Sequence, residues 1–197
     1  MGILEKIEKK EAIVGVIGMG YVGLPLAILS SSFSFSTIGF DVDEEKVKRL
    51  KEGKSYIKHI KNEDIKKAIS NNFKATSDFQ KLSKCDVILI CVPTPLTEHL
   101  EPDMQYIEKT GIEISKNLRK EQLIVLESTT YPGTTEEFLI PILEKSGLKA
   151  GKDFYVAFSP EREDPGNPVF HTRIIPKVVG GLDENSLKVA VAFYEKI

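Results

Sequence analysis

The sequence has no excess of positive charge. Its 27 lysines and arginines are balanced by 29 aspartates and glutamates, which gives a formal net charge of −2 and a pI near 6.0. A chain with this balance has no strongly basic face to attract nucleic acid or anionic lipid. We therefore expect neither a nucleic acid nor a membrane among its partners.

Cysteine and histidine are scarce, with two cysteines and three histidines in 197 residues. Cys85 and Cys91 bound the apolar run CDVILIC, a context typical of buried, reduced thiols in a cytoplasmic protein. His59, His99 and His171 lie far apart without the spacing of metal ligands, so we expect no metal site. A chain of this length buries roughly 70% of its unfolded surface, so its core needs neither disulfide nor metal.

One long run without charged side chains covers residues 12–33, AIVGVIGMGYVGLPLAILSSSF. A helix of ~20 apolar residues would cross a bilayer, but the glycines and the proline inside this run would weaken such a helix. The preceding segment MGILEKIEKKE mixes acids with its lysines, unlike a signal peptide, and Lys6 breaks the myristoylation pattern after Gly2. The run therefore predicts a ligand-binding segment rather than a membrane anchor.

Strand-like apolar runs alternate along the chain with helical patterns, in which apolar residues recur every three or four positions. Strands are expected at 12–17, 36–42, 86–92, 122–129, 154–159 and 177–181. Helices are expected after the glycine-rich stretch and at 43–53, 62–72, 104–120, 134–147 and 183–197. This alternation predicts an α/β fold that is Rossmann-like and doubly wound, with a mostly parallel sheet and helices on both faces. Because no repeat or linker interrupts it, we expect one domain over residues 1–197.

A glycine motif, GMGYVG, directly follows the first expected strand and opens a helix. Gly18 would permit the tight turn, Gly20 would let a pyrophosphate approach the backbone, and Gly23 would let the helix pack closely on the strand. The free N–H groups of this turn would bind the negative charge of a ligand at the positive end of the helix dipole. We expect Tyr21 and Val22 among the binding residues. The motif therefore predicts a dinucleotide-binding turn.

Asp41 strengthens this prediction because it ends the next apolar strand about twenty residues further on. That is the spacing of the acid that accepts hydrogen bonds from the adenosine ribose in NAD sites. Its carboxylate would repel a 2′-phosphate, so NAD is favoured over NADP. Lys46 and Lys48 lie nearby and would soften this repulsion, or else they belong to the solvated face of their helix. The alternative, a tight turn and a surface acid, leaves the common register of strand, glycines, helix and acid unexplained.

Four further stretches follow strand-like runs and so belong at the carboxyl edge of the sheet, where open α/β sheets bind ligands. They are CVPTPL, ESTTYPGTT, SPEREDPGN and IPKVVGG. Together with GVIGMGYVGLPLA, they resemble in order and spacing the N-terminal domain of the UDP-glucose/GDP-mannose dehydrogenase family, over essentially the whole chain. ESTTYPGTTEE and SPEREDPGN depart from the STVPVGT and PEFLREG patterns of the UDP-glucose enzymes. They are more similar to UDP-N-acetylglucosamine 6-dehydrogenases, which serve the synthesis of surface polysaccharides.

The resemblance implies an enzyme that oxidises the C6 hydroxyl of a UDP-sugar, here UDP-N-acetylglucosamine, to a carboxylate with two NAD⁺. The family's reaction passes through a thiohemiacetal and a thioester on a cysteine. Thr94 of VPTP would contact the cofactor near its ribose and nicotinamide end. The cofactor-binding residues that the resemblance implies beyond the glycine turn are Val92, Pro93, Thr94, Ser128 and Thr129.

The resemblance also implies two catalytic residues. Thr129 of STT matches the threonine that helps to position the catalytic water and the developing oxyanion. Glu161 of SPE matches a glutamate at the sugar end of the site, where a carboxylate can act as a base or orient water. The second glutamate of PEFLREG aligns with Pro165 here, so its role is vacant or passes to Glu163 or Asp164.

Each of these residues also has a purely structural interpretation. Thr129 can cap a turn before the following helix, with Thr134 or Thr135 as the helix N-cap. Glu161 and Arg162 can form a surface ion pair of little consequence. The family pattern favours the functional roles.

The family's catalytic cysteine belongs to a glycine-rich stretch in the C-terminal half, and no such stretch appears before Ile197. Cys91 ends a strand and is not expected to be the nucleophile. We therefore expect this chain to be the NAD-binding domain of a longer enzyme, without that enzyme's sugar-nucleotide domain. In the full-length enzyme, which we expect to be a homo-oligomer, the two domains would share the UDP-sugar substrate. The alternatives are a β-hydroxyacid or 3-hydroxyacyl dehydrogenase domain, or a non-enzymatic NAD-sensing module.

Overall fold

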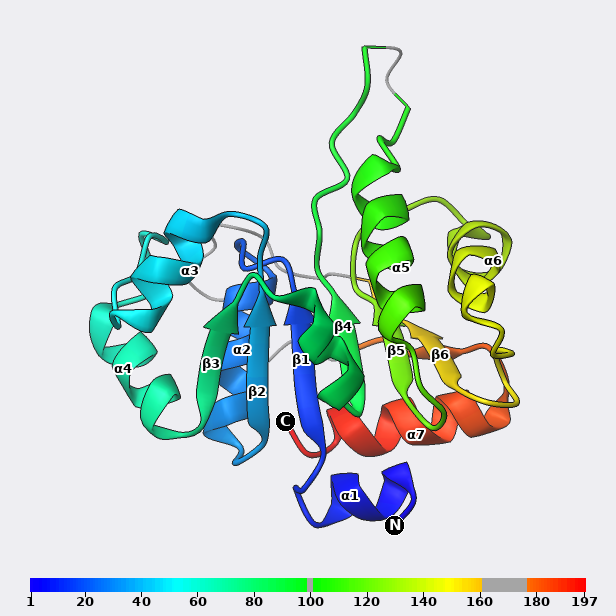
Figure 1. Ribbon diagram of the computed structural model, residues 1–197, viewed down its shortest axis with the longest axis horizontal. Helices are drawn as coiled ribbons and strands as arrows, with labels where there is room; N and C mark the ends of the chain where they lie inside the picture. The colour runs from blue at the N-terminus through cyan, green and yellow to red at the C-terminus, as the bar shows by residue number, and fades with distance from the viewer. Residues whose placement is uncertain (99–100, 161–176) are drawn as a thin grey trace.

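A seven-stranded sheet forms the centre of the computed structural model, which describes residues 1–98, 101–160 and 177–197 (Figure 1). The strand order is β3-β2-β1-β4-β5-β6-β7, and only β7 runs antiparallel to its neighbour. The predicted Rossmann-like, mostly parallel sheet is thus confirmed. The strands are β1 (Ile13–Ile17), β2 (Ser36–Phe40), β3 (Phe73–Thr76), β4 (Val87–Ile90), β5 (Leu123–Leu126), β6 (Tyr155–Phe158) and β7 (Gly180–Gly181).

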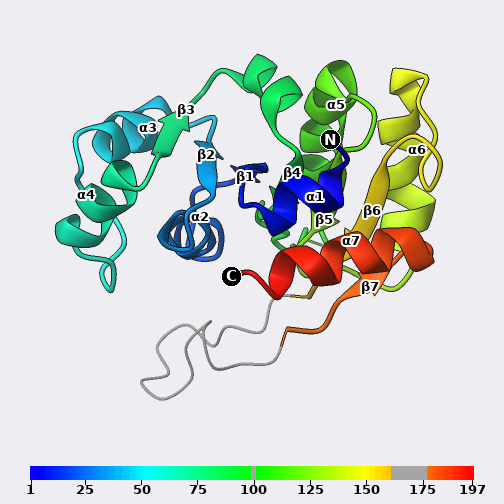
Figure 2. The ribbon, with the colours of Figure 1, turned by 90° about the horizontal axis from the view of Figure 1, so that it is seen from below.

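Helices cover both faces of this sheet. Seen along the strands, α2 and α7 lie on one side, and α5 and α6 lie on the other (Figure 2). The α-helices are α1 (Ile3–Glu8), α2 (Gly23–Ser32), α3 (Glu44–Lys51), α4 (Asn62–Ser70), α5 (Gln105–Asn117), α6 (Ile140–Leu143) and α7 (Glu184–Tyr194). Within the described ranges, no helix is long and apolar enough to cross a membrane.

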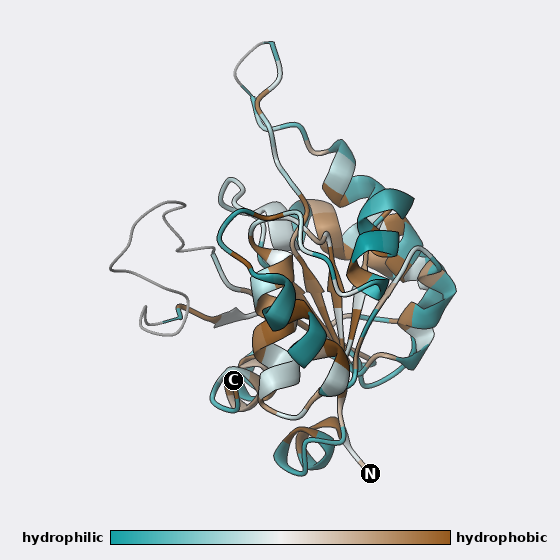
Figure 3. Ribbon diagram, turned by 90° about the vertical axis from the view of Figure 1, so that its left-hand side faces the viewer, coloured by the Kyte–Doolittle hydropathy of each residue, from teal (hydrophilic) through white to brown (hydrophobic). Residues whose placement is uncertain are grey.

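The central strands are apolar at every position because both of their faces are buried. In β4, Val87 and Leu89 join the core beneath α2 and α7, whereas Ile88 and Ile90 join the core beneath α5 and α6. This alternation follows from the two-residue repeat of a strand. Figure 3 shows the same arrangement, with brown strands at the centre and teal segments on the surrounding helices.

The strand order reverses its direction between β1 and β4, which lie side by side with Ile17 opposite Ile90. From β1 the chain passes into α2, and from β4 it passes into the long loop that extends beyond the sheet in Figure 1. Loops that leave neighbouring strands on opposite sides open a crevice at their carboxyl ends, where open α/β sheets bind ligands. The fold therefore places the glycine turn and the VPTP stretch at the carboxyl ends of two adjacent strands.

The elements that were not predicted from the sequence include α1, β3 and a 3₁₀ helix at Phe79–Lys84. The first is α1, whose Ile3 and Ile7 are buried against α7 although the segment reads as a charged lead. Its Lys6 binds Asp86 Oδ1 at 2.8 Å, and Arg119 binds the same oxygen at 2.6 Å. The second is β3, a short edge strand whose exposed Lys74 interrupts its apolar pattern. Both elements are too short for periodicity to identify them.

The expected helix at 134–147 and the expected strand at 177–181 are only partly correct. The helix is a π-helical turn at Thr134–Leu139, then α6, then a 3₁₀ turn at Glu144–Ser146. Pro141, at the start of α6, lacks the N–H that a regular α-helix would use there. The predicted N-cap at Thr134 or Thr135 is wrong, because Gly133 occupies that position with φ +90°. Only the last two residues of the expected strand form β7.

Candidate functional site

The glycine turn after β1 has the geometry that close packing requires. Gly18 adopts φ +92°, and a Cβ there would lie 2.6 Å from the Cys91 carbonyl oxygen. A Cβ on Gly23 would collide with the Gly18 carbonyl oxygen. Gly20, in contrast, faces open space, with no atom within 4 Å of the position that a Cβ would take. Two glycines therefore let β1, α2 and β4 approach one another, and the third leaves the backbone open to a ligand.

The start of α2 presents backbone N–H groups at this opening. Val22 precedes the helix and packs against the core, and no side chain of the described residues caps the helix start. Tyr21 is 57% exposed beside it. Leu24 N and Leu26 N donate to the Gly20 and Val22 carbonyl oxygens, and Pro25 has no N–H, so the N–H groups open to a ligand are those of residues 20–23, at the positive end of the helix dipole. The arrangement suits an anionic group such as a pyrophosphate.

Asp41 lies directly after β2 and points back to the glycine turn. Its Oδ2 accepts a hydrogen bond from Met19 N at 2.9 Å, and its Oδ1 accepts one from Asp43 N at 3.0 Å. The residue is only 7% exposed, and Lys46 Nζ lies 3.7 Å from Oδ2. A carboxylate offers about four acceptor positions, so these two bonds leave capacity for a ribose. Asp41 therefore shapes the turn as well as facing the site, which the sequence motif alone does not reveal.

Tyr56 also reaches the glycine turn, from the connection between α3 and α4. Its hydroxyl donates a hydrogen bond to the Met19 carbonyl oxygen at 2.6 Å. Sequence reasoning missed this residue because the connection carries no motif and lies in neither an expected strand nor an expected helix.

The carboxyl ends of β4 and β5 are tied together by two side-chain hydroxyls. Thr94 Oγ1 donates to the Thr129 carbonyl oxygen at 2.7 Å, and Ser128 Oγ donates to the Val92 carbonyl oxygen at 2.7 Å. The side chain of Thr129 remains exposed, as does neighbouring Pro93. The structure thus brings together the VPTP stretch, expected near the ribose and nicotinamide end of a cofactor, and the STT stretch, expected to bind the cofactor and to position the catalytic water.

A buried ionic cluster lies immediately before Ser128. Glu127 is fully buried, and its Oε2 accepts from Lys177 Nζ at 2.6 Å. Its Oε1 accepts a hydrogen bond from the hydroxyl of Tyr194 on α7. Burial and then the charge of Glu127 raise the pKa of Tyr194 well above its usual value, so this hydroxyl stays a donor. Glu127 therefore anchors the start of the ESTT turn to α7, a role that sequence reasoning did not assign.

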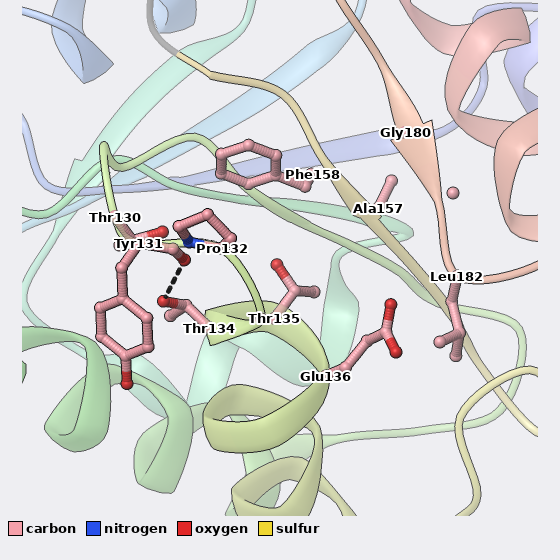
Figure 4. A pocket seen from close by; sticks show the side chains of 12 residues that line it. Thr130, Tyr131, Pro132, Thr134, Thr135, Glu136, Ala157, Phe158, Gly180 and Leu182 are labelled. Atoms are coloured by element: carbon pink, nitrogen blue, oxygen red, sulfur yellow. Dashed lines mark hydrogen bonds between the residues drawn. The ribbon is translucent and has the colours of Figure 1, made fainter.

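A cavity of about 400 Å³ opens beyond this turn (Figure 4). Thr134 Oγ1 donates to the Tyr131 carbonyl oxygen at 2.7 Å and holds the near wall in shape. The cavity is lined by the segment after β5 and by β6 and β7, namely residues 130–136, Ala157, Phe158 and residues 180–182. Thr130, the neighbour of Thr129, thus opens onto a cavity at the carboxyl edge of the sheet.

Several residues that the sequence analysis singled out lie outside the described residues. They are Glu161, Arg162, Glu163, Asp164, Pro165, His99 and His171. The catalytic role expected of Glu161 therefore stays a prediction. In the part of the chain that the structure describes, no group of three His, Cys, Asp or Glu side chains is arranged to hold a metal ion.

The two cysteines are both buried. Burial, and then the charge of Asp86, raise the pKa of Cys85 to about 12. Cys91 is 8% exposed, and its backbone carbonyl lies against Gly18. Because the thiolate is the reactive form of cysteine, the state of Cys85 agrees with the prediction of an inert, buried thiol.

Comparison with known proteins identifies the family. Residues 12–197 match the model of the UDP-glucose/GDP-mannose dehydrogenase family, NAD binding domain. Protein CapL of Staphylococcus aureus is 38% identical over 93% of this chain and 43% of its own length. A UDP-N-acetyl-D-glucosamine 6-dehydrogenase of Pseudomonas aeruginosa is 36% identical over 95% of this chain and 44% of its own length.

A solved structure gives the same result. The NDP-N-acetyl-D-galactosaminuronic acid dehydrogenase of Methanosarcina mazei Go1 superposes with a TM-score of 0.86 at 35% identity, covering 100% of this chain and 45% of that one. This chain thus spans less than half the length of these relatives. A match along nearly the whole chain sets aside the β-hydroxyacid and 3-hydroxyacyl dehydrogenase alternative. The chain belongs to the UDP-glucose/GDP-mannose dehydrogenase family, and it corresponds to that family's NAD-binding domain.

Proposed function

We propose that this chain is the NAD-binding domain of an enzyme that oxidises the C6 hydroxyl of UDP-N-acetylglucosamine to a carboxylate with two NAD⁺. The observation that carries the proposal is the glycine turn, where Gly20 faces open space and Asp41 holds the Met19 N–H. The turn lies beside the end of β4, on the same sheet edge as Thr94 and Thr129.

The chain's own residues supply the parts of a dinucleotide site. Backbone N–H groups of residues 20–23 would bind the pyrophosphate, and the free acceptor positions of Asp41 would bind the adenosine ribose. The negative charge of Asp41 disfavours a 2′-phosphate, which selects NAD⁺ over NADP⁺, although Lys46 at 3.7 Å offsets part of that charge. When bound, the nicotinamide would accept the hydride.

The reacting end of the substrate would lie at the junction of β4 and β5. The exposed Thr129 hydroxyl would orient water and stabilise developing negative charge, and Glu161 would act there as a base. The cavity that begins at Thr130 lies beside this junction. Neither buried thiol is suited to form the covalent intermediates, so the nucleophile would come from the part of the relatives that this chain does not cover.

The family comparison supports the choice of sugar. A relative over the same region is named UDP-N-acetyl-D-glucosamine 6-dehydrogenase, which supports UDP-N-acetylglucosamine as the substrate. We further propose a cytoplasmic homo-oligomer in the complete form, in which a second domain shares the UDP-sugar.

Calorimetric titration of the 197-residue chain with NAD⁺ and with NADP⁺ tests the cofactor assignment. We expect NAD⁺ to bind at least about tenfold more tightly, a difference of ~1.4 kcal/mol. Equal affinities for the two cofactors, or no binding of NAD⁺, would contradict the proposal.

A further inference from the structure

The connection between α3 and α4 contacts the glycine turn at two points. Tyr56 donates its hydroxyl hydrogen bond to the Met19 carbonyl oxygen at 2.6 Å. The ring of His59 lies 5.9 Å from the ring of Tyr21, measured between centroids. Met19 and Tyr21 both belong to the GMGYVG motif, so this connection packs against one side of the glycine turn.

The connection is held in place by its own contacts. Ser55 N donates to Asn62 Oδ1 at 2.8 Å, and Ile57 N donates to Ser55 Oγ at 3.1 Å. Ile57 and Ile60 are buried in the core beneath α2. These contacts define the position of Tyr56 without help from a ligand.

The Tyr56 side chain is held from its other side by Arg49 of α3. The guanidinium carbon lies 5.7 Å from the ring centroid, and Nη2 donates to the Ser55 carbonyl oxygen. Burial, followed by the negative charges of Asp41 and Asp43, raises the pKa of Tyr56 above its usual value. The hydroxyl therefore stays protonated at neutral pH and keeps donating to Met19.

Both peptide groups that flank Met19 are thus fixed. The Met19 N–H donates to Asp41 Oδ2 at 2.9 Å, and the Met19 carbonyl accepts from Tyr56. In a planar trans peptide the carbonyl and the following N–H point in opposite directions. When Tyr56 holds the Met19 carbonyl on its side, the N–H of Gly20 must point away from the connection, at the residue that faces open space.

We propose that Tyr56 is a positioning residue of the dinucleotide site, which aims the Gly20 N–H at the cofactor pyrophosphate by holding the Met19 carbonyl. The inference rests on the proposed function, because it assumes that a dinucleotide occupies the turn. The inference predicts that Tyr56 contributes to the affinity only of ligands that carry the pyrophosphate. Adenosine, which carries no pyrophosphate and would bind on the side of Asp41, does not depend on it.

The test compares Tyr56→Phe with the unmodified 197-residue chain and with Tyr106→Phe, a control on α5 that removes the same atom from a 45% exposed tyrosine. Binding of NAD⁺ and ADP-ribose is measured by calorimetry, adenosine binding by competition, and the melting temperature of each ligand-free chain is recorded. We expect Tyr56→Phe to weaken NAD⁺ and ADP-ribose about fivefold, as loss of one hydrogen bond does. Adenosine affinity should stay within twofold, and the control should match the unmodified chain.

The outcomes separate this inference from the proposed function. NAD⁺ affinity that is unchanged in Tyr56→Phe overturns the inference and leaves the cofactor assignment intact. An equal loss for adenosine and ADP-ribose also overturns it, because a general loosening of the site weakens both. An unmodified chain that binds no NAD⁺ overturns the proposed function, and this inference with it.

Discussion

Asp41 has two roles, and substitution to alanine would remove both at once and so could not distinguish them. Its carboxylate organises the glycine turn through Met19 N–H, and in the proposed function it also binds the ribose. Asparagine keeps an oxygen that can accept from Met19 and removes the negative charge. Asp41→Asn therefore separates the shape of the turn from the electrostatic selection of the cofactor.

We expect Asp41→Asn to weaken NAD⁺ binding about tenfold and to bring the NAD⁺ to NADP⁺ affinity ratio close to one. The reason is the loss of a charge-assisted hydrogen bond, worth ~1.5–3 kcal/mol, together with the repulsion of the 2′-phosphate. Calorimetry with both cofactors measures the ratio. Asp43→Asn is the control, because Asp43 accepts from Glu45 N and Lys46 N at the start of α3 and should leave the ratio unchanged. A wild-type ratio in Asp41→Asn would refute the role of its charge.

Thr129→Ala in a complete enzyme should lower kcat about a hundredfold, because it removes a donor for the developing oxyanion. The melting temperature and NAD⁺ affinity should hardly change, since Thr94 binds the backbone carbonyl of residue 129, which alanine retains. Ser128→Ala, which loses the bond to Val92, should instead lower the melting temperature. Glu161→Gln should also lower kcat. Normal turnover in both Thr129→Ala and Glu161→Gln would reduce these two residues to structural roles.

Part of this site was predictable from the sequence because its residues follow strands. Gly18, Gly20 and Gly23 occur in a fixed motif, and Asp41 and Thr94 come directly after apolar runs whose carboxyl ends meet at one edge. Tyr56 could not be found in this way, because its position depends on how a loop without periodicity packs against the core. Residues of that kind become visible only when the tertiary contacts are known.

At the scale of elements, α1 is attached to the sheet through one buried carboxylate. Asp86 accepts from Lys6 at 2.8 Å, from Ile13 N at 2.9 Å and from Arg119 at 2.6 Å. Burial by itself raises the pKa of Asp86, but these hydrogen bonds and the Arg119 charge outweigh it and hold the pKa below its usual value. The ionised form is therefore favoured by folding.

Asp86→Asn should lower the free energy of unfolding by about 2 kcal/mol at pH 7, the scale of a hydrogen bond to a charged group. Lys6 and Arg119 are each about one-third exposed, so solvent screens part of the pairing. The folded-state pKa lies below the unfolded value of about 3.9. The stabilisation is therefore complete above that value and is lost as the pH falls through the folded-state pKa.

Urea unfolding from pH 7 down to pH 3 measures this effect. The difference between wild type and Asp86→Asn should hold to about pH 5 and shrink below about pH 4. Glu5→Gln is the matched control on α1, because the Glu5–Lys9 pair is half exposed and should contribute less than about 0.5 kcal/mol. A difference that persists unchanged at pH 3 would contradict the assignment.

The elements predicted correctly are those whose buried positions give a clear pattern of apolar residues in the sequence. The central strands β4 and β5 are apolar at all positions, and α3 to α5 show apolar residues at helical spacing. The irregular helix after Gly133 kept its helical pattern in the sequence, but the position of Pro141 changed its geometry. The short α1 contacts Asp86 and α7, which are distant in sequence, so a local pattern does not reveal these contacts.

At the scale of the whole molecule, we expect the 197-residue chain to bind NAD⁺ without oxidising UDP-N-acetylglucosamine. The covalent step needs an accessible thiolate, whereas Cys85 is buried with its pKa raised to about 12 and Cys91 is only 8% exposed. The chain also spans less than half of its relatives' length, so residues that would close over the sugar are absent from the reaction mixture.

NADH absorbance in a mixture of the chain, NAD⁺ and UDP-N-acetylglucosamine tests this expectation, with NAD⁺ binding measured in parallel by calorimetry. The absorbance should stay at the level of a mixture without protein. Sustained NADH production at enzyme-like rates would show that the nucleophile lies within these 197 residues.

The two edge strands of the sheet, β3 and β7, influence whether copies of this chain aggregate. Unpaired backbone groups on a long, flat border strand recruit strands from other molecules and start aggregation. Here β7 contributes only two glycines, paired with Ala157 and Phe158, and the four-residue β3 carries the exposed Lys74. Within the described residues, neither border offers a long apolar template for intermolecular strand addition, so concentrated samples should resist the growth of β-rich aggregates while the fold is intact.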